Sequence, residues 1–300
     1  MTTIRASDPV AHDFAASVAG VAGQAAEGDP WQPGSMKSDS NPALLERLED
    51  IGWRELAVNA ELAAVVGPAA YELGRTLAPL DTLDMLLGGA LSVGGLSRYA
   101  GEGSTLAELR GARIVLSRAE ELEPVAYVDA IGAARVVRAS ATGEADQPSI
   151  RRAAWLSANA GYLAGALGYG LELTLAHAKA RVAFGRPLAA LDTVQQQLAE
   201  VATAADGLRL LSLSRTDDAA LAHATVSTTE GLAGCHQLTG AIGFTLEFPL
   251  QRALRRTRSM RAWLEPIVYD ASYVTGAVLT VDGGRSLGPQ LHQRAASEDE

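Results

Sequence analysis

The run from Ala153 to Leu171 constrains the fold most strongly, because its 19 residues carry no charge. That length approaches the ~20 apolar residues that cross a bilayer. Ala and Gly dominate the run, however, Asn159 lies inside it, and large aliphatic side chains are few, so transfer to lipid would gain little. Small residues favour close helix packing instead. The sequence therefore predicts a buried helix of a soluble bundle, and no membrane partner.

The glycines of this run, in GYLAGALGYG (Gly161 to Gly170), resemble a dinucleotide-binding loop only superficially. Such a loop follows a strand and opens a helix, so that backbone N–H groups meet the pyrophosphate. Here the glycines lie within a helical run that no strand precedes. We expect them to serve helix packing, because glycine lets two backbones approach closely.

Composition limits the cellular compartments and the classes of partner that we expect for this chain. The 300-residue chain has a formal net charge of −10 and a pI near 5.1, so it would repel nucleic acid, whose phosphates supply most of its affinity for proteins. The single Cys235 cannot form an internal disulfide, and the 5 histidines show no zinc-ligand spacing, so we expect no metal site. Charges interrupt the stretch from Met1 to Gly20, where a secretory signal would be apolar. We therefore expect a cytoplasmic protein.

Residues 1–105 are predicted to form an N-terminal helical domain. After a loop rich in Pro, Gly and Ser, Asn41 is a plausible N-cap with Pro42 at the first helical position, and Gly52 ends this short helix. Helical periodicity and small apolar residues predict further helices from Glu61 to Leu77 and from Leu80 to Ser97.

The remaining chain is predicted to hold a small β region and a larger bundle. The β-branched runs ARIVLS, PVAYVDAI and ARVVRAS indicate a reduced β-domain over residues 106–148. Residues 149–266 are predicted to form a helical bundle, and residues 267–300 an appended strand and turn with an acidic tail. The helices expected in the bundle are Ile150 to His177, Leu188 to Ser214, Asp218 to Leu238 and about Pro249 to Leu264. The fold class is thus mainly α with a small β region.

One candidate site is the helix break after Lys179. The predicted helix carries Arg181 and ends at Phe184 and Gly185. An Arg beside a helix break can act as a rigid fork for phosphate, with an aromatic face available for a flat ring. Alternatively, the Arg only complements the dipole of the helix C-terminus.

A second candidate is the phrase CHQLTGAIGFTLEFPLQRALRR, residues 235–256. Gln237 ends a helix, and Gly240 and Gly243 expose backbone amides in a tight turn. Such a turn suits docking of an amide or a phosphate.

Together and in this order, the two phrases resemble the C-terminal bundle of acyl-CoA dehydrogenases. That family shows R-x-x-F-G-x-x-[IL], then V-Q-x-x-L-A, then Q-x-x-G-x-x-G-[FY]-x-x-E-x-P-[LI]-x-R. The matching residues are Arg181, Phe184, Gly185 and Leu188; Val194, Gln195, Leu198 and Ala199; and Gln237, Gly240, Gly243, Phe244, Glu247, Pro249, Leu250 and Arg252. The resemblance implies N-terminal helices, a β-domain and a C-terminal four-helix bundle. LLERLEDIGWRELAV and AAYELGRTLAPLDTL extend it, more weakly, over most of the chain.

In that family FAD lies at a subunit interface. The resemblance implies that Arg181, Phe184 and Gln237 reach the pyrophosphate and adenosine of a neighbour's FAD, and that Gly240 allows close backbone approach. Ala241 stands where the family usually has a second glycine.

The departures from the family concern the flavin ring and the catalytic base. The loop that holds the ring, of the T-E-P-x-A-G-S-D type, is absent. Spacing places the family's two alternative base positions on Leu264 and Trp155, neither of which is a carboxylate. The catalytic residue is therefore unknown; Glu265, by a one-residue shift, and Glu247 are the candidates.

Two further features have simpler interpretations. YVTGAVLTVDGG, residues 273–284, resembles the last strand of short-chain dehydrogenases, but the glycine loop and Y-x-x-x-K pair of those enzymes are missing. The arginines between Arg252 and Arg261 indicate salt bridges across a subunit contact, or contact with CoA or FAD phosphates.

The resemblance thus implies one subunit of a heteromeric, FAD-dependent acyl-CoA dehydrogenase. It would pair with a full-length partner subunit in a heterotetramer and share its FAD. The substrate would be a bulky acyl-CoA such as a steroid side chain, as in lipid and steroid degradation. The alternatives are a non-catalytic structural or regulatory subunit without cofactor contact and, less favoured, a short-chain dehydrogenase.

Overall fold

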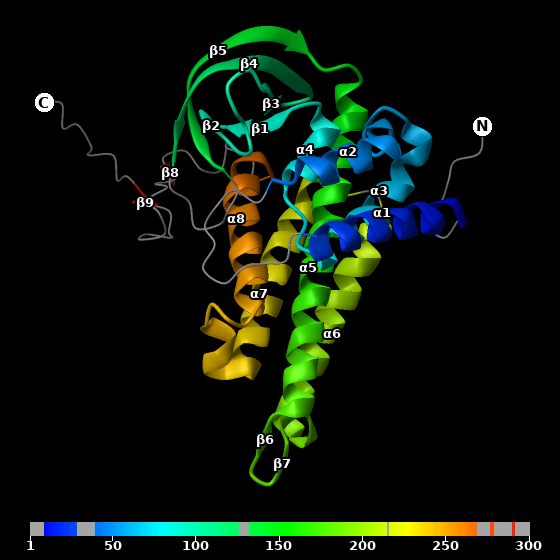
Figure 1. Ribbon diagram of the computed structural model, residues 1–300, viewed down its shortest axis with the longest axis vertical. Helices are drawn as coiled ribbons and strands as arrows, with labels where there is room; N and C mark the ends of the chain where they lie inside the picture. Colours follow the sequence, from blue (N-terminus) through cyan, green and yellow to red (C-terminus); the bar gives the residue numbers. More distant parts are fainter. Residues whose placement is uncertain are drawn as a thin grey trace, which may run out of the picture.

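The computed structural model describes residues 9–28, 40–125, 132–214, 216–268, 277–278 and 290–291. A small β-barrel lies at one end of the molecule, short helices pack beside it, and long helices run away from it (Figure 1). The predicted fold class, mainly α with a small β region, is confirmed.

The N-terminal helices begin much as the sequence predicts. Asn41 caps α2, and its side-chain oxygen accepts the N–H of Leu44 at 3.1 Å, with Pro42 in the first turn. Gly52 follows the helix with a φ of 84°, which favours glycine. The elements are α1 (Pro9–Gly28), α2 (Pro42–Asp50), the 3₁₀ turns η1 (Arg54–Ala57) and η2 (Ala60–Leu62), and α3 (Ala63–Arg75).

The predicted helix from Leu80 to Ser97 is wrong in its second half. Only α4 (Asp81–Asp84) and the 3₁₀ turn η3 (Met85–Leu87) are helical, and strands β1 (Ala90–Val93) and β2 (Leu96–Ser97) follow. Gly88 ends η3 with a φ of 91°, and Gly94 and Gly95 turn the chain between the strands with positive φ. The strands therefore begin within the range assigned to the helical domain.

Five strands close into a barrel in the order β1, β2, β5, β4, β3. Strand β1 pairs parallel with β3, with Leu91 opposite Ala107, and the other pairs are antiparallel. Leu91, Leu106 and Ile114 are buried. The remaining strands are β3 (Thr105–Arg110), β4 (Arg113–Pro124) and β5 (Ala134–Glu144). Residues 126–131 of the predicted PVAYVDAI run lie outside the described residues.

Four long helices form the C-terminal bundle, as predicted. The uncharged run lies in α5, where Trp155, Tyr162 and Leu163 are fully buried. None of the described helices is both long and apolar enough to cross a membrane. The bundle consists of α5 (Pro148–Ala180), α6 (Asp192–Ser212), α7 (Asp218–Thr239) and α8 (Leu250–Val268). Beyond α8, the short strands β8 (Ala277–Val278) and β9 (Gln290–Leu291) pair antiparallel; the rest of the predicted tail lies outside the described residues.

Helices α3 and α5 touch backbone to backbone. A Cβ added at Gly161 would overlap the carbonyl oxygen of Gly67, and one added at Gly165 would overlap that of Tyr71. On the facing helix, a Cβ at Gly74 would overlap the carbonyl oxygen of Tyr162. The glycines therefore serve close packing, because no other residue fits between these backbones.

Replacing one of these glycines should destabilise the protein although alanine is the better helix former. Gly165→Ala forces α3 and α5 apart, which we expect to cost about 1 to 3 kcal/mol. Gly207→Ala is the matched control, because Gly207 lies within α6 and no heavy atom is within 4 Å of its added Cβ. That change should stabilise by about 0.5 to 1 kcal/mol. Thermal melts of both variants test the prediction, and equal shifts would contradict it.

Candidate functional site

A β-hairpin interrupts the chain between α5 and α6. Helix α5 ends at Ala180, and the N–H of Arg181 donates to the carbonyl of His177 at 2.8 Å. Strands β6 (Val182–Ala183) and β7 (Arg186–Pro187) then pair, with Phe184 and Gly185 at the tip. These two residues have φ values of 53° and 75°, as in a two-residue type I′ turn. The predicted helix end at Phe184 is therefore wrong, since the helix stops earlier.

The hairpin forms the end of an arm, which we define as residues 175–198. Ala178 is the one residue of the arm that is buried, and all buried residues of α6 lie at Val201 or beyond. The arm projects from the end of the bundle opposite the barrel (Figure 1). At its tip Phe184 is 92% exposed, and Val182 is 58% exposed. Large apolar side chains exposed together in this way are typical of an interaction surface.

The connection from α7 to α8 presents the second candidate site. Gln237 is exposed on the last turn of α7, and Gly240 follows the helix with a φ of 63°. Nothing lies within 4 Å of a Cβ added at Gly240, so its backbone is open to approach. The 3₁₀ turn η5 (Gly240–Phe244) comes next. Two apolar side chains of η5, Ile242 and Phe244, are exposed, and so is Leu246 just after the turn. We call these three side chains the η5 surface.

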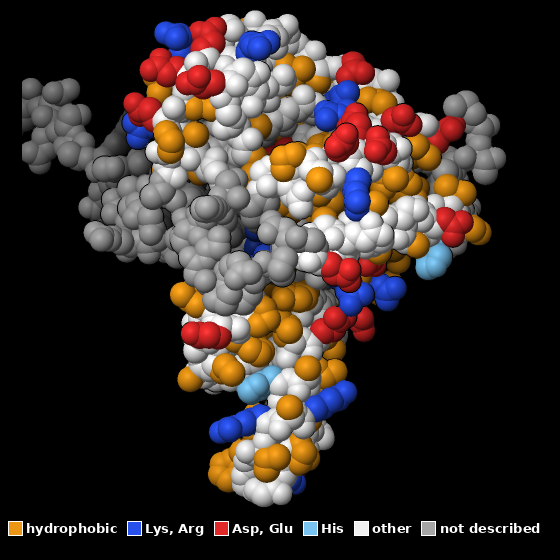
Figure 2. Space-filling model, viewed as in Figure 1, with side chains coloured by type: hydrophobic (Ala, Val, Ile, Leu, Met, Phe, Trp, Pro, Cys, Tyr) orange, Lys and Arg blue, Asp and Glu red, His pale blue; other side chains and the backbone are white. Residues whose placement is uncertain are grey.

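The two sites lie at the same end of the bundle but come from separate segments. Figure 1 shows the hairpin and the α7–α8 connection both at the lower end, and Figure 2 shows hydrophobic side chains exposed there. Within the described residues, no hydrogen bond or ion pair joins Arg181 or Phe184 to Gln237 or Gly240. No described carboxylate pairs with Arg181 either. The predicted residues thus form two separate exposed groups at one end of the bundle, and they do not line a single closed pocket.

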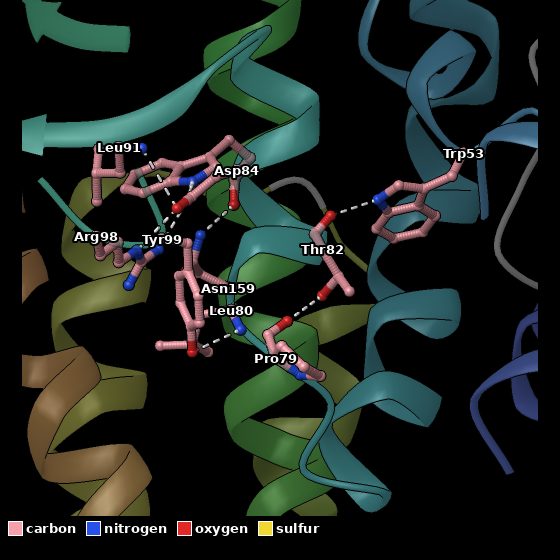
Figure 3. Close-up of polar contacts among 10 residues, drawn as sticks. Trp53, Pro79, Leu80, Thr82, Asp84, Leu91, Arg98, Tyr99 and Asn159 are labelled. Atoms are coloured by element: carbon pink, nitrogen blue, oxygen red, sulfur yellow. Dashed lines mark hydrogen bonds and ion pairs between the residues drawn. The ribbon is translucent and has the colours of Figure 1, made fainter. Parts of the chain in front are cut away.

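One of the two predicted base positions lies in a buried polar cluster. Trp155 of α5 is fully buried, and its Nε1–H donates to Oδ1 of Asp84 at 3.3 Å. Asp84 accepts two bonds from the Arg98 guanidinium, at 2.8 Å from Nε and 2.7 Å from Nη2 (Figure 3). Burial alone would lower the pKa of Arg98, but Asp84 more than offsets this and raises it, so the guanidinium stays charged.

The other base position lies beside the same guanidinium. Arg98 stacks over the ring of Trp263 in α8, 5.9 Å from its centroid, and the next residue, Leu264, is fully buried. Both positions are therefore closed core positions. Sequence reasoning missed this cluster, although Asp84 and Arg98 flank an otherwise uncharged apolar run, which is an available signal of buried charge.

The two candidate carboxylates lie at opposite ends of α8. Glu265 is on the last turns, where its Oε1 accepts a bond from Nε of Arg261 at 2.8 Å. Glu247 is exposed just before the first turn, about 28 Å away along a 19-residue helix. They cannot serve one site together.

One arginine of α8, Arg256, differs from the prediction. Arg256 is buried within its own chain and donates to the carbonyls of Leu77 and Ala78 and to the hydroxyl of Tyr162. It is therefore an internal contact and not part of a subunit surface. No three His, Cys, Asp or Glu side chains gather as a metal site among the described residues.

Comparisons with known proteins agree with this architecture. Residues 157–264 match the sequence model of the acyl-CoA dehydrogenase C-terminal domain. No curated protein sequence matches the chain. Similar solved structures include a variant of the Tcur3481-Tcur3483 steroid ACAD, with 16% identity, a TM-score of 0.63, and coverage of 85% of this chain and 93% of the other.

Two further structures are similar over the same extent. The ChsE4-ChsE5 complex from Mycobacterium tuberculosis has 15% identity and a TM-score of 0.63, covering 91% of this chain and 96% of the other. A glutaryl-CoA dehydrogenase from Mycobacterium smegmatis in complex with FADH2 has 14% identity and a TM-score of 0.62, covering 88% and 92%. The chain therefore has the acyl-CoA dehydrogenase fold. Its residues 157–264 match the model of that family's C-terminal domain, and the predicted resemblance is confirmed.

Breaking the buried ion pair should cost far more than breaking an exposed one. Asp84→Asn leaves Arg98 buried without a counter-ion, which we expect to lower the free energy of unfolding by about 3 to 5 kcal/mol. Glu144→Gln is the control, because Glu144 pairs with Arg113 at 3.1 Å on the barrel surface and should cost at most about 1 kcal/mol. Denaturant titrations compare the two, and similar midpoints would contradict the central role of the cluster.

Proposed function

We propose that this chain is one subunit of a heteromeric, FAD-dependent acyl-CoA dehydrogenase. It supplies Arg181, Phe184, Gln237 and Gly240 to the distal end of an FAD shared with a full-length partner subunit. The observation that carries the proposal is the arm, which places an almost fully exposed aromatic ring beyond the chain's own core. The similarity to the Tcur3481-Tcur3483 steroid ACAD and to the ChsE4-ChsE5 complex supports a bulky acyl-CoA substrate and a partner of the same fold.

The exposed residues suit the two ends of an adenosine diphosphate group. A guanidinium without a described partner can form a bidentate contact with phosphate oxygens. The Phe184 ring can stack on an adenine face. The open backbone at Gly240 allows a phosphate to approach the adjacent N–H groups, as in other anion-binding turns. The residues present therefore fit the pyrophosphate and adenosine half of FAD.

The chemical step is assigned to the partner. Bound flavin would accept the hydride from the substrate's β-carbon, while a base takes the α-proton. In this chain Trp155 and Leu264 occupy the two base positions, and both are fully buried. The role of this subunit is then to hold the cofactor and complete the interface.

A second candidate is a structural or regulatory subunit that does not touch FAD. The buried base positions agree with both candidates equally. The presence or absence of bound flavin in the complex therefore distinguishes them. Co-expression with the partner, followed by purification and an absorbance spectrum, tests the proposal. A stable complex without flavin would favour the second candidate, and a lone monomer would contradict both.

Arg181→Ala should weaken flavin retention by the complex. A charge-assisted contact to phosphate contributes about 1.5 to 3 kcal/mol, which corresponds to about 10 to 150-fold in affinity. Arg181→Lys should recover only part, because a point charge lacks the bidentate fork. The flavin-to-protein ratio after dilution measures the effect.

Arg113→Ala is the matched control, because this arginine is also exposed but lies on the barrel. It should leave the flavin content unchanged. If Arg181→Ala lowers only the melting temperature, then Arg181 serves the helix C-terminus, and its cofactor role is refuted.

Neither candidate carboxylate of this chain should act as the base. We expect Glu265→Gln and Glu247→Gln to leave the activity of the complex nearly unchanged, because Glu265 pairs with Arg261 and Glu247 is at the far end of α8. Loss of a general base typically costs about 10² to 10⁴-fold in rate. A fall of that size in either variant, measured with an artificial electron acceptor, would return the base to this chain.

A further inference from the structure

Two histidine–phenylalanine contacts hold the segment between α7 and α8, residues 240–249, on the bundle. The His236 ring of α7 lies 4.7 Å from the Phe244 ring, measured between centroids. The His177 ring of α5 meets the Phe248 ring edge-on at 6.0 Å. Two of the 5 histidines in the chain, each from a different helix, therefore contact this one segment.

His236 differs from an ordinary packing residue because both of its ring nitrogens are unsatisfied. The residue is 2% exposed, and neither Nδ1 nor Nε2 has a hydrogen-bond partner among the described residues. Gly243 of η5 lies directly against the ring, since a Cβ added there would be 3.3 Å from Nδ1. Water can therefore reach these nitrogens freely only when η5 moves away.

The surroundings oppose a positive charge on this ring. Burial, and then the nearby Arg258 of α8, lower the pKa of His236 below the ordinary value of 6.5. Turn η5, with the sequence GAIGF, contributes no titratable side chain. Among the described residues, Arg258 is the one charged group that acts on the pKa of this ring, and no carboxylate offsets it.

We propose that His236 is a proton-operated latch that keeps the 240–249 segment seated while its ring is neutral, and so positions the η5 surface and Gln237. The first half of this proposal concerns the chain alone. The second half rests on the proposed function, in which that surface meets the partner and its FAD.

The direction follows from proton linkage. The closed segment favours the neutral ring, so its stability is fully present above the ordinary histidine pKa and falls as the pH drops below it. The imidazolium has two N–H donors, and it regains hydrogen bonds to water once η5 lifts. With one proton taken up on opening, the opening equilibrium rises by up to about tenfold per pH unit in that window.

Hydrogen–deuterium exchange on the purified chain tests the latch. We compare amides of residues 240–249 at about pH 7.5 and about pH 5.5, on either side of the ordinary pKa, after correction for the intrinsic exchange rate. Protection of this segment should fall by up to about tenfold at the lower pH, while that of the buried turns of α5 stays constant. His236→Phe, which keeps the ring contact but cannot titrate, should remove the pH dependence.

His223→Gln is the matched control, because His223 lies on the same helix, is exposed, and has only Ser227 as a described partner. It should keep the pH dependence. His177→Gln should also keep it, and loss of the effect in that variant instead of His236→Phe would overturn the proposal.

A titration of the wild-type histidines by NMR decides the matter if His236→Phe does not fold. His236 should titrate below the ordinary histidine value of 6.5, and a midpoint at or above that value would overturn the latch. The complex provides the last comparison: loss of partner and flavin toward pH 5.5, abolished by His236→Gln, would support both halves. A latch in the chain with a complex that is indifferent to pH would refute only the assignment of the η5 surface to the partner.

Discussion

Direct contact between the backbones of α3 and α5 is the constraint on which the rest of the structure depends. Gly161 and Gly165 let α5 lie against α3 without intervening side chains, and Gly74 does the same from the side of α3. Because the two helices belong to the N-terminal part and the bundle, this contact joins the two halves of the chain. It also sets the direction in which the 33-residue α5 extends, and so carries the arm away from the core.

The buried ion pair lies near the start of α5, at the end of that helix opposite the arm. Asp84, Arg98, Trp155 and Trp263 come from four separate segments and tie the barrel, the short helices and the bundle together. Trp155 and Leu264, which spacing assigned to the family's two base positions, both lie in the closed core of this chain. Under the proposed function, the chemical step falls to the partner, and the exposed arm and η5 surface of this chain are left for contact.

The sequence predicted those elements whose signals are local. The N-cap at Asn41, the four bundle helices and the packing role of the glycines depend on residues close together in the chain, and all three agree with the structure. The strands before Leu106 were missed because small apolar residues suit a buried helix and a strand equally well. The partnership of Asp84 with Arg98 depends on tertiary contacts that spacing does not encode. The hairpin was missed because a helix break and a two-residue turn share the same glycine signal. For the site, Arg181, Phe184, Gln237 and Gly240 were named through a resemblance, and the structure adds that each is exposed; their roles toward FAD remain predictions.

The turn at the end of the arm has a consequence for how this chain evolves. Phe184 holds a left-handed backbone conformation, which costs a non-glycine residue about 1 to 2 kcal/mol. A chain selected only for its own folding would carry Asn or Gly there, and would gain solubility by losing an exposed ring. Under the proposed function, retaining phenylalanine is a trade-off, because the free subunit gives up stability and solubility that it recovers only when the partner covers the ring. A copy of the chain produced without that partner would then be the form most exposed to aggregation and to removal by cellular quality control.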